Sequence, residues 1–382
     1  MTRVAQEIVD ALRQQYRHAN RTERSTILDL FVETTGCHRK YAIAVLGGKR
    51  RRTKGESRRP RKRRYGEEEV QALVRLSDLF GGLCSKRLRA AMDVELARLY
   101  FADDLSISPG CYDNLKRISP ATIDRLLKGR RAQLVKSRGY TKPGTLLKHQ
   151  IPVRTWAEWT EDRPGFCEMD LVDHSGGRVI RGADHAWTLC FTDVYSGWTE
   201  CVAVRNKAQV HVFEAIKRAR NRLPFPLLGV DSDNGSEFIN HQLLRYCRAE
   251  QITFTRGRAG NKNDSSYAEQ KNWSVVRRVA GYLRYDTPEQ LSLLNRIYLA
   301  VHYHGNFFVP AMKLAAKTRV GSKVRRCYGK PQTPFARLLA SPEVAAEHKD
   351  ALRETYALLN LVDLHHQLTD LEEALLRTRP AR

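Results

Sequence analysis

Apolar residues recur at helical spacing in the first third of the chain and change to short strand-like runs after about residue 163. Val4, Ile8 and Leu12, for example, are spaced as on one face of a helix. The later runs end at turn residues, which is typical of strands. The pattern therefore predicts an α+β chain with several domains.

Residues 1–48 predict a DNA-binding helix-turn-helix unit. A helix over 39–46 follows a turn at Gly36, where a left-handed backbone conformation is easy. Arg39 and Lys40 stand at the start of this helix, where a recognition helix meets base edges. A plain helical hairpin is the alternative interpretation.

Residues 65–136 predict a second helical unit, again with a candidate helix-turn-helix. One of its helices is expected to begin after Ser119, because Ser is a preferred N-cap and Pro120 suits the first helical position. Two such units would allow one protein to bind a DNA site longer than a single recognition helix reads.

After a connector over 137–162, residues 163–285 predict an α/β domain with the element order βββαβαβα. The expected strands span 166–172, 187–193, 198–204, 227–231 and 252–255, and the expected helices span 208–222, 238–250 and 265–281. The turn Tyr195-Ser196-Gly197 predicts that the second and third strands form a hairpin.

The chain carries a large excess of positive charge, which indicates a polyanionic partner. It has 66 Lys and Arg against 42 Asp and Glu, a net charge of +24. Residues 49–64 hold eleven basic residues and one acid. A purely solvated linker is one interpretation, but we favour an arm that follows the phosphate backbone of DNA. The expected contacts in this basic linker are Arg50, Arg51, Arg52, Arg61, Lys62, Arg63 and Arg64.

The composition also argues against several classes of protein. No uninterrupted apolar stretch approaches the roughly eighteen residues of a membrane span, so we expect no membrane partner. Glu7 precedes any apolar run, which differs from a secretory signal. The eight cysteines are scattered without a Cys-x-x-Cys pair, so we expect no structural zinc site and a reducing cytoplasm.

Three acids stand where a catalytic site could form. Asp170 lies within the first expected strand, Asp233 follows the fourth, and Glu269 lies on the helix after a Gly-rich loop, with 35 residues between Asp233 and Glu269. Asp173 and Asp231 are competing acids, and strand alternation puts residues 170 and 173 on opposite faces. Three carboxylates can hold two divalent cations, and oxygen ligands suit Mg²⁺.

This set of acids resembles that of the DDE transposases and retroviral-type integrases. The resemblance covers about residues 160–285 and depends on Asp170, on the run Asp-Asn-Gly-Ser-Glu-Phe from Asp233, on the 35-residue gap and on Glu269. It implies an RNase H-like catalytic core with a mixed five-stranded sheet, flanked as in a bacterial insertion-sequence transposase. Retroviral integrases carry an N-terminal His/Cys zinc module that this chain lacks, so the helix-turn-helix units would take over end recognition.

The resemblance also implies a chemistry. It implies a polynucleotidyl transferase that uses two Mg²⁺ ions, for which Mn²⁺ can substitute. In this family's arrangement Asp170 would bridge both ions, Asp233 would hold one of them and Glu269 would hold the other. Water would cut the element end, and the freed 3′-hydroxyl would attack target DNA. The expected partners are double-stranded DNA, as element ends and target, and further copies of the chain in a homo-multimer at the bacterial nucleoid. A catalytically silent DNA-binding regulator and an RNase H-like nuclease without strand transfer are the alternatives.

Other polar residues near these acids have supporting or competing roles. Lys271, Asn272, Arg277 and Arg278 are expected phosphate contacts. Lys262 belongs to a Gly-rich loop that could close over the DNA. Asp193, Glu237 and Asp264 fit turns or helix starts, and His174, His185 and His241 are disfavoured as metal ligands because three carboxylates already suit a hard cation.

The C-terminal part predicts a small basic β module over 286–340 and a helical tail over 341–382. An apolar stripe runs along the tail from Leu352 to Leu375. The stripe fits either packing within the chain or a partner helix, and we favour self-association because such enzymes must join two DNA ends.

Overall fold

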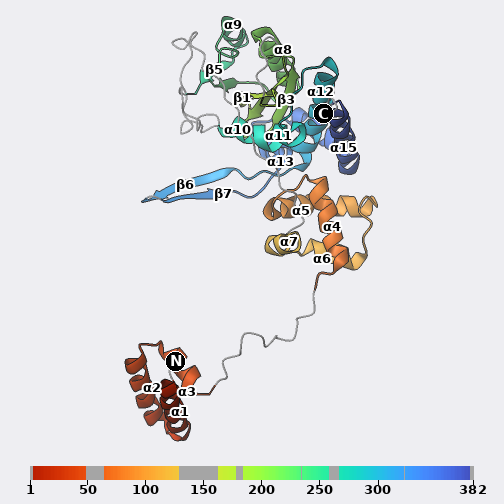
Figure 1. Ribbon diagram of the computed structural model, residues 1–382. Coiled ribbons are helices and arrows are strands. Elements are labelled where there is room, and N and C mark those ends of the chain that lie inside the picture. Colours follow the sequence, from red (N-terminus) through yellow and green to blue (C-terminus); the bar gives the residue numbers. More distant parts are fainter. Residues whose placement is uncertain are drawn as a thin grey trace. The chain divides into compact units, whose positions relative to one another are not determined.

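The computed structural model describes residues 3–48, 64–128, 162–177, 184–233, 235–257, 266–321 and 323–378. They belong to two units, which divide between Arg64 and Tyr65 (Figure 1). The predicted DNA contacts Arg50, Arg51, Arg52, Arg61, Lys62, Arg63 and Lys262 lie outside the described residues, as do Asn234, Asp264 and nearly all of the connector. No helix in the described ranges is long and apolar enough to cross a membrane.

The first unit consists of three helices, α1 (Arg3–His18), α2 (Arg21–Thr35) and α3 (Arg39–Leu46). Its core contains Leu28, Phe31 and Leu46. Gly36 ends α2 with a φ of +66°, and the His38 side chain accepts a hydrogen bond from the Lys40 amide and caps α3. The predicted helix over 39–46 and the left-handed turn before it are confirmed.

The second unit begins with four helices, α4 (Glu67–Leu79), α5 (Ser85–Phe101), α6 (Pro109–Lys116) and α7 (Pro120–Leu126). Ser119 caps α7 by accepting a hydrogen bond from the Thr122 amide, which confirms the predicted cap. Leu73 and Leu88 of these helices belong to one apolar core together with Phe335 and Leu352 near the C-terminus. The segment thus shares its core with the C-terminal part of the chain.

A mixed five-stranded sheet forms the centre of the second unit, in the order β3-β2-β1-β4-β5. Its strands are β1 (Phe166–Asp173), β2 (Trp187–Asp193), β3 (Thr199–Val204), β4 (Gly229–Ser232) and β5 (Thr253–Arg256). β2 is antiparallel to β1 and β3, whereas β4 is parallel to β1 and β5. All five predicted strands are confirmed, in the order along the chain that the sequence predicts.

Helices cover both faces of the sheet. They are α8 (Gln209–Arg220), α9 (His241–Ala249), α10 (Ser266–Lys271), the π-helix η2 (Asn272–Val276), α11 (Arg277–Ala280), α12 (Pro288–Tyr303) and the π-helix η3 (His304–Phe308). Strand alternation directs Cys167, Met169 and Leu171 of β1 towards α8 and α9, while Val172 joins the core that contains α12. Asp170 has the same parity as Val172 and therefore faces the side of α10 to α12.

The C-terminal part contains a hairpin of β6 (Leu314–Val320) and β7 (Lys323–Tyr328), followed by α13 (Pro334–Ala340), α14 (Ala346–Leu358) and α15 (Leu361–Arg377). The predicted basic β module is therefore confirmed as a hairpin, but the expectation of β structure across 286–340 is wrong because α12 occupies its first part. The preference for self-association through the apolar stripe is also wrong. Leu352, Leu364, Leu368, Leu371 and Leu375 are buried within the chain.

Two adjacent leucines on α15 test this burial. Leu375 is 1% exposed and Leu376 is 46% exposed. We expect Leu375→Ala to lower the free energy of unfolding by about 2–5 kcal/mol, and Leu376→Ala to change it by less than about 0.5 kcal/mol. Chemical denaturation measures both free energies, and equal losses for the two variants would contradict the burial of Leu375 within the chain.

His304 connects η3 to the end of α4. Its Nε2 lies 2.7 Å from the Leu79 carbonyl oxygen, and burial lowers the pKa of the imidazole to about 4. The unfolded chain, with an ordinary histidine pKa near 6.5, then binds more protons, so this contribution to stability is full above about pH 6.5 and is lost as the pH falls towards 4.

A His304→Gln variant is therefore expected to be less sensitive to acid. From pH 7 to pH 5 the wild type should lose about 2 kcal/mol more unfolding free energy than the variant, because one pKa unit corresponds to about 1.36 kcal/mol. Urea denaturation at the two pH values measures the difference. Parallel losses in both proteins would mean that His304 does not carry the effect.

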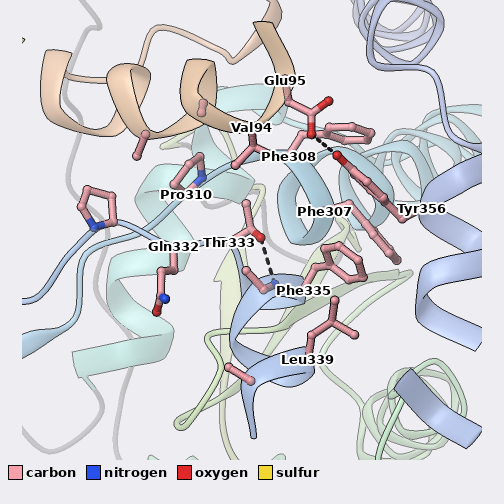
Figure 2. A pocket seen from close by; sticks show the side chains of 15 residues that line it. Val94, Glu95, Phe307, Phe308, Pro310, Gln332, Thr333, Phe335, Leu339 and Tyr356 are labelled. Carbon is pink, nitrogen blue, oxygen red and sulfur yellow. Dashed lines mark hydrogen bonds between the residues drawn. The ribbon is translucent and has the colours of Figure 1, made fainter. Parts of the chain in front are cut away.

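A cavity of about 560 Å³ opens between α5, η3, α13 and α14 (Figure 2). Phe307, Phe335 and Leu339 line it, and at one wall the Tyr356 hydroxyl donates a hydrogen bond to Glu95. None of the three predicted catalytic acids lines this cavity. The predicted catalytic acids therefore do not belong to this cavity.

Candidate active site

Asp170 lies near the middle of β1, the central strand of the sheet. Its Oδ1 accepts a hydrogen bond from the Leu171 amide at 2.8 Å, and its Oδ2 accepts one from Nδ2 of Asn272 at 2.6 Å. Burial, followed by the negative charges of Asp233 and Glu269, raises the pKa of Asp170 to about 7. The Asp170 carboxyl group is thus harder to ionise than an ordinary aspartate, and a bound cation would offset this effect.

Asp233 follows β4 directly. Because β4 runs parallel to β1, the residues after β4 lie at the same edge of the sheet as the end of β1. The Asp233 carboxylate accepts a hydrogen bond from the Gly235 amide at 2.9 Å, and burial raises its pKa although Lys207 opposes the shift. A Cβ on Gly235 would stand 2.7 Å from the Glu237 carboxyl carbon, so a side chain at 235 would disturb this turn.

Glu269 lies on α10 with an exposed side chain. The start of α10 is held by Glu168, whose Oε2 accepts hydrogen bonds from the amides of Tyr267 at 2.8 Å and Ala268 at 2.9 Å. Burial first, and then the neighbouring Asp231, raise the pKa of Glu168 to about 8. The interpretation of the sequence missed Glu168, although its parity with Asp170 on the same strand indicates the same face.

The structure therefore brings the three predicted acids into one electrostatic environment, because both Asp233 and Glu269 act on Asp170. Within the described ranges, no three His, Cys, Asp or Glu side chains are already arranged to hold a metal ion. The donor set itself fits a hard divalent cation, because a cation would offset both the burial and the mutual repulsion of the carboxylates.

The competing acids have structural partners. Asp173 accepts hydrogen bonds from the Ser175 amide at 2.8 Å and pairs with His185 at 2.7 Å. Asp231 accepts from the Thr255 hydroxyl at 2.5 Å. Asp193 accepts from the amide of Ser196 at 2.6 Å and so holds the turn after β2, as expected.

The three histidines that were considered as metal ligands have structural positions of their own. His174 is fully buried, with Nε2 2.8 Å from the Thr188 hydroxyl oxygen, and burial lowers its pKa to about 3. His185 pairs with Asp173, and His241 begins α9. His174 and His185 thus have partners within the chain.

The predicted phosphate contacts on the helix of Glu269 make contacts within the chain. Lys271 donates from Nζ to the Gly197 carbonyl oxygen at 3.1 Å, and Asn272 binds Asp170. Arg277 donates to the Asp173 carbonyl oxygen at 2.6 Å, and Arg278 packs over Gly81 at the end of α4. Contact between DNA and Lys271 or Asn272 would therefore require these hydrogen bonds to be exchanged.

In the first unit, the side chain of Arg39 pairs with Asp29 and donates to the Ser25 hydroxyl at 2.9 Å, which connects α3 to α2. Lys40, the next residue, is exposed, as is Arg64 at the end of the unit. Lys40 thus presents a charge at the start of α3, where base or phosphate contacts were predicted.

Comparisons with known proteins bear on the family of this chain. Residues 161–262 match the family described as an integrase core domain, a range that includes Asp170 and Asp233 and ends before Glu269. An uncharacterized protein of Sinorhizobium fredii, y4rM, is 40% identical over 339 residues, which cover 87% of this chain and 94% of the relative.

Two solved structures are also similar. The catalytic core domain of BIV integrase is 18% identical with a TM-score of 0.31, over 49% of this chain and 98% of that chain. The HTLV-2 integrase catalytic core domain, in a trimeric form in complex with magnesium, is 15% identical with a TM-score of 0.25, over 31% of this chain and 70% of that chain.

The sheet order, the integrase core match and the relative that spans most of the chain lead to one assignment. The chain belongs to the DDE transposase and integrase family, and its function is of the transposase or integrase type. Proteins with this core generally use a divalent metal and bind DNA.

Proposed function

We propose that the protein is a DNA transposase that binds the ends of its element, hydrolyses a phosphodiester to free a 3′-hydroxyl, and joins this hydroxyl to target DNA. The observation that carries the proposal is the position of Asp170, whose pKa is raised first by burial and then by the charges of Asp233 and Glu269. Two acids would suffice for many general acid and base reactions. Three acids that influence one another's charge suit two-metal phosphoryl chemistry better.

Asp170 would hold two Mg²⁺ or Mn²⁺ ions, Asp233 would hold one of them and Glu269 the other. When bound, the ions activate the attacking oxygen and stabilise the leaving oxygen of the phosphodiester. Asn272 orients the Asp170 carboxylate through its 2.6 Å hydrogen bond. Glu168 fixes the start of α10 and thereby the position of Glu269.

The remaining positive charge would bind DNA. Lys40 at the start of α3 would contact element ends, and Arg39 would join it by exchanging its bonds to Asp29 and Ser25. The basic linker would follow the phosphate backbone. A homo-multimer would hold two ends together, so that both can be joined to one target.

A cleavage and joining assay tests the proposal. The full chain is incubated in Mg²⁺ or Mn²⁺ with a labelled duplex that carries the terminal sequences flanking its gene. Joined strands identify a transposase. Nicked ends without joined strands would identify a nuclease of the same fold. Binding without any cleavage in either metal would identify a silent regulator and contradict the enzymatic proposal.

A further inference from the structure

The β6–β7 hairpin is a two-stranded ribbon that forms a sheet of its own. In Figure 1 it extends away from the five-stranded sheet of the second unit. Wherever its side chains are described between residues 315 and 328, they are exposed on both faces of the ribbon. A two-stranded sheet without a buried face is only marginally stable in water, so this ribbon gains little from packing.

The ribbon is strongly cationic. Residues 313–330 contain seven Lys and Arg, and no acid occurs between Glu289 and Glu343. The register pairs Thr318 with Arg325 and Arg319 with Val324. Strand alternation puts Arg319 and Arg326 on one face and Arg325 on the other. The ribbon therefore presents positive charge on both faces.

We propose that the β6–β7 hairpin is a DNA-binding arm that lies in the major groove of duplex DNA. Paired strands lie about 4.8 Å apart, and the major groove, about 12 Å wide, accepts a two-stranded ribbon with its side chains. The minor groove, about 6 Å wide, is narrower than such a ribbon. Cations on both faces would meet the phosphates on both walls of the groove. The inference deepens the proposed function, on which it rests for the nature of the partner.

The base of the arm is joined to the helix of Glu269 through one turn of the sheet. We name residues 195–197 the 195–197 turn. Each of its three backbone carbonyl oxygens accepts a hydrogen bond from a cationic side chain. The donors are Lys313 Nζ to Tyr195 at 2.6 Å, Arg337 Nη1 to Ser196 at 2.8 Å and Lys271 Nζ to Gly197 at 3.1 Å.

These three cations come from different elements. Lys313 directly precedes β6, Arg337 lies on α13, and Lys271 is two residues beyond Glu269 on α10. Arg337 also donates to the carbonyl of Ala311, where an isolated bridge to Gln332 closes the base of the arm. DNA held by the arm would thus be held in a defined position relative to Glu269.

The salt dependence of duplex binding by the full chain, measured in EDTA so that no strand is cut, tests the arm. In Arg325→Gln/Arg326→Gln, the slope of log binding constant against log salt concentration should become shallower by about 1.8, because each phosphate that an arginine neutralises contributes about 0.9 to this slope. Arg353→Gln/Arg377→Gln removes the same charge from exposed positions on α14 and α15 and should leave the slope near that of the wild type.

Photo-cross-linking supplies a second readout. A photoreactive phenylalanine in place of Tyr328, which is 52% exposed on β7, should cross-link to the duplex, whereas one in place of the 88% exposed Leu358 should not. A major-groove ligand such as methyl green should suppress the cross-link, and a minor-groove ligand such as netropsin should not.

Any of three results would overturn the proposal. The salt-dependence slope of Arg325→Gln/Arg326→Gln could equal that of the control variant, or the cross-link from position 328 could be no stronger than that from position 358. The third is a cross-link that netropsin alone suppresses. These outcomes do not depend on strand cleavage. If wild-type protein neither cuts nor joins DNA, the proposed function fails while the binding data still decide the role of the arm.

Discussion

Replacing Asp170 by Asn is expected to abolish cleavage and joining of DNA while duplex binding is retained. Asn keeps the shape and one acceptor for Asn272 but removes the charge that two divalent cations require. Because such cations stabilise the transition state by several kcal/mol, and about 1.36 kcal/mol is tenfold in rate, the loss should be at least about a thousandfold. Product formation on a labelled duplex measures the loss.

Asp173→Asn is the matched control for this prediction. Asp173 lies on the same strand, but its carboxylate bonds to Ser175 and His185. The hydrogen bond from Arg277 goes to the backbone carbonyl oxygen of Asp173, which the substitution leaves in place. Its replacement should change the rate by less than about tenfold. If Asp173→Asn removed activity and Asp170→Asn did not, the assignment of the first carboxylate would be wrong.

Replacing Glu168 by Ala is expected to slow cleavage by roughly a hundredfold with little change in DNA affinity. The substitution removes the acceptor of the Tyr267 and Ala268 amides, so the start of α10 loses its anchor and Glu269 loses its position. A displacement of about 1 Å in a reacting group can cost about a hundredfold in rate. The measurement is the cleavage rate at saturating protein, together with the dissociation constant of the duplex.

Glu168→Gln distinguishes this positioning role from a role in metal binding. Gln retains an oxygen that can accept from the two amides, and the raised pKa of Glu168 means that a negative charge is not favoured there. The rate should therefore return to within about tenfold of the wild type. A Gln variant as slow as the Ala variant would indicate that the charge of Glu168 itself is required.

The central sheet could be predicted from the sequence because its strands are short apolar runs between clear turn residues. Asp170 and Asp233 could be located because each is tied to a strand, and strand parity fixes the face on which Asp170 lies. Glu269 depended on the spacing after Asp233. Strand position and sequence spacing can be obtained from the sequence without knowledge of tertiary contacts.

The features that the sequence did not reveal depend on contacts between distant segments. The first part of 286–340 was expected to be a β module, yet Leu293, Leu294 and Ile297 pack a helix against the sheet. An apolar helix face looks the same whether it meets a partner or its own chain, so the stripe on α14 and α15 was assigned wrongly. The role of Glu168 and the cations bound by the 195–197 turn were missed because these partners lie about a hundred residues away in the sequence.

The most direct test of the central claim is a strand-joining assay, in which terminal DNA is joined to a target. It compares the wild-type protein with the variants Asp170→Asn, Asp233→Asn and Glu269→Gln. The full chain, Mg²⁺ and a labelled duplex with the terminal repeats suffice, and denaturing electrophoresis resolves joined from cut strands. We expect joined product with the wild type and none with the three variants, all four binding the duplex. Joined product from any one of the variants at the wild-type rate would contradict the assignment of the three acids.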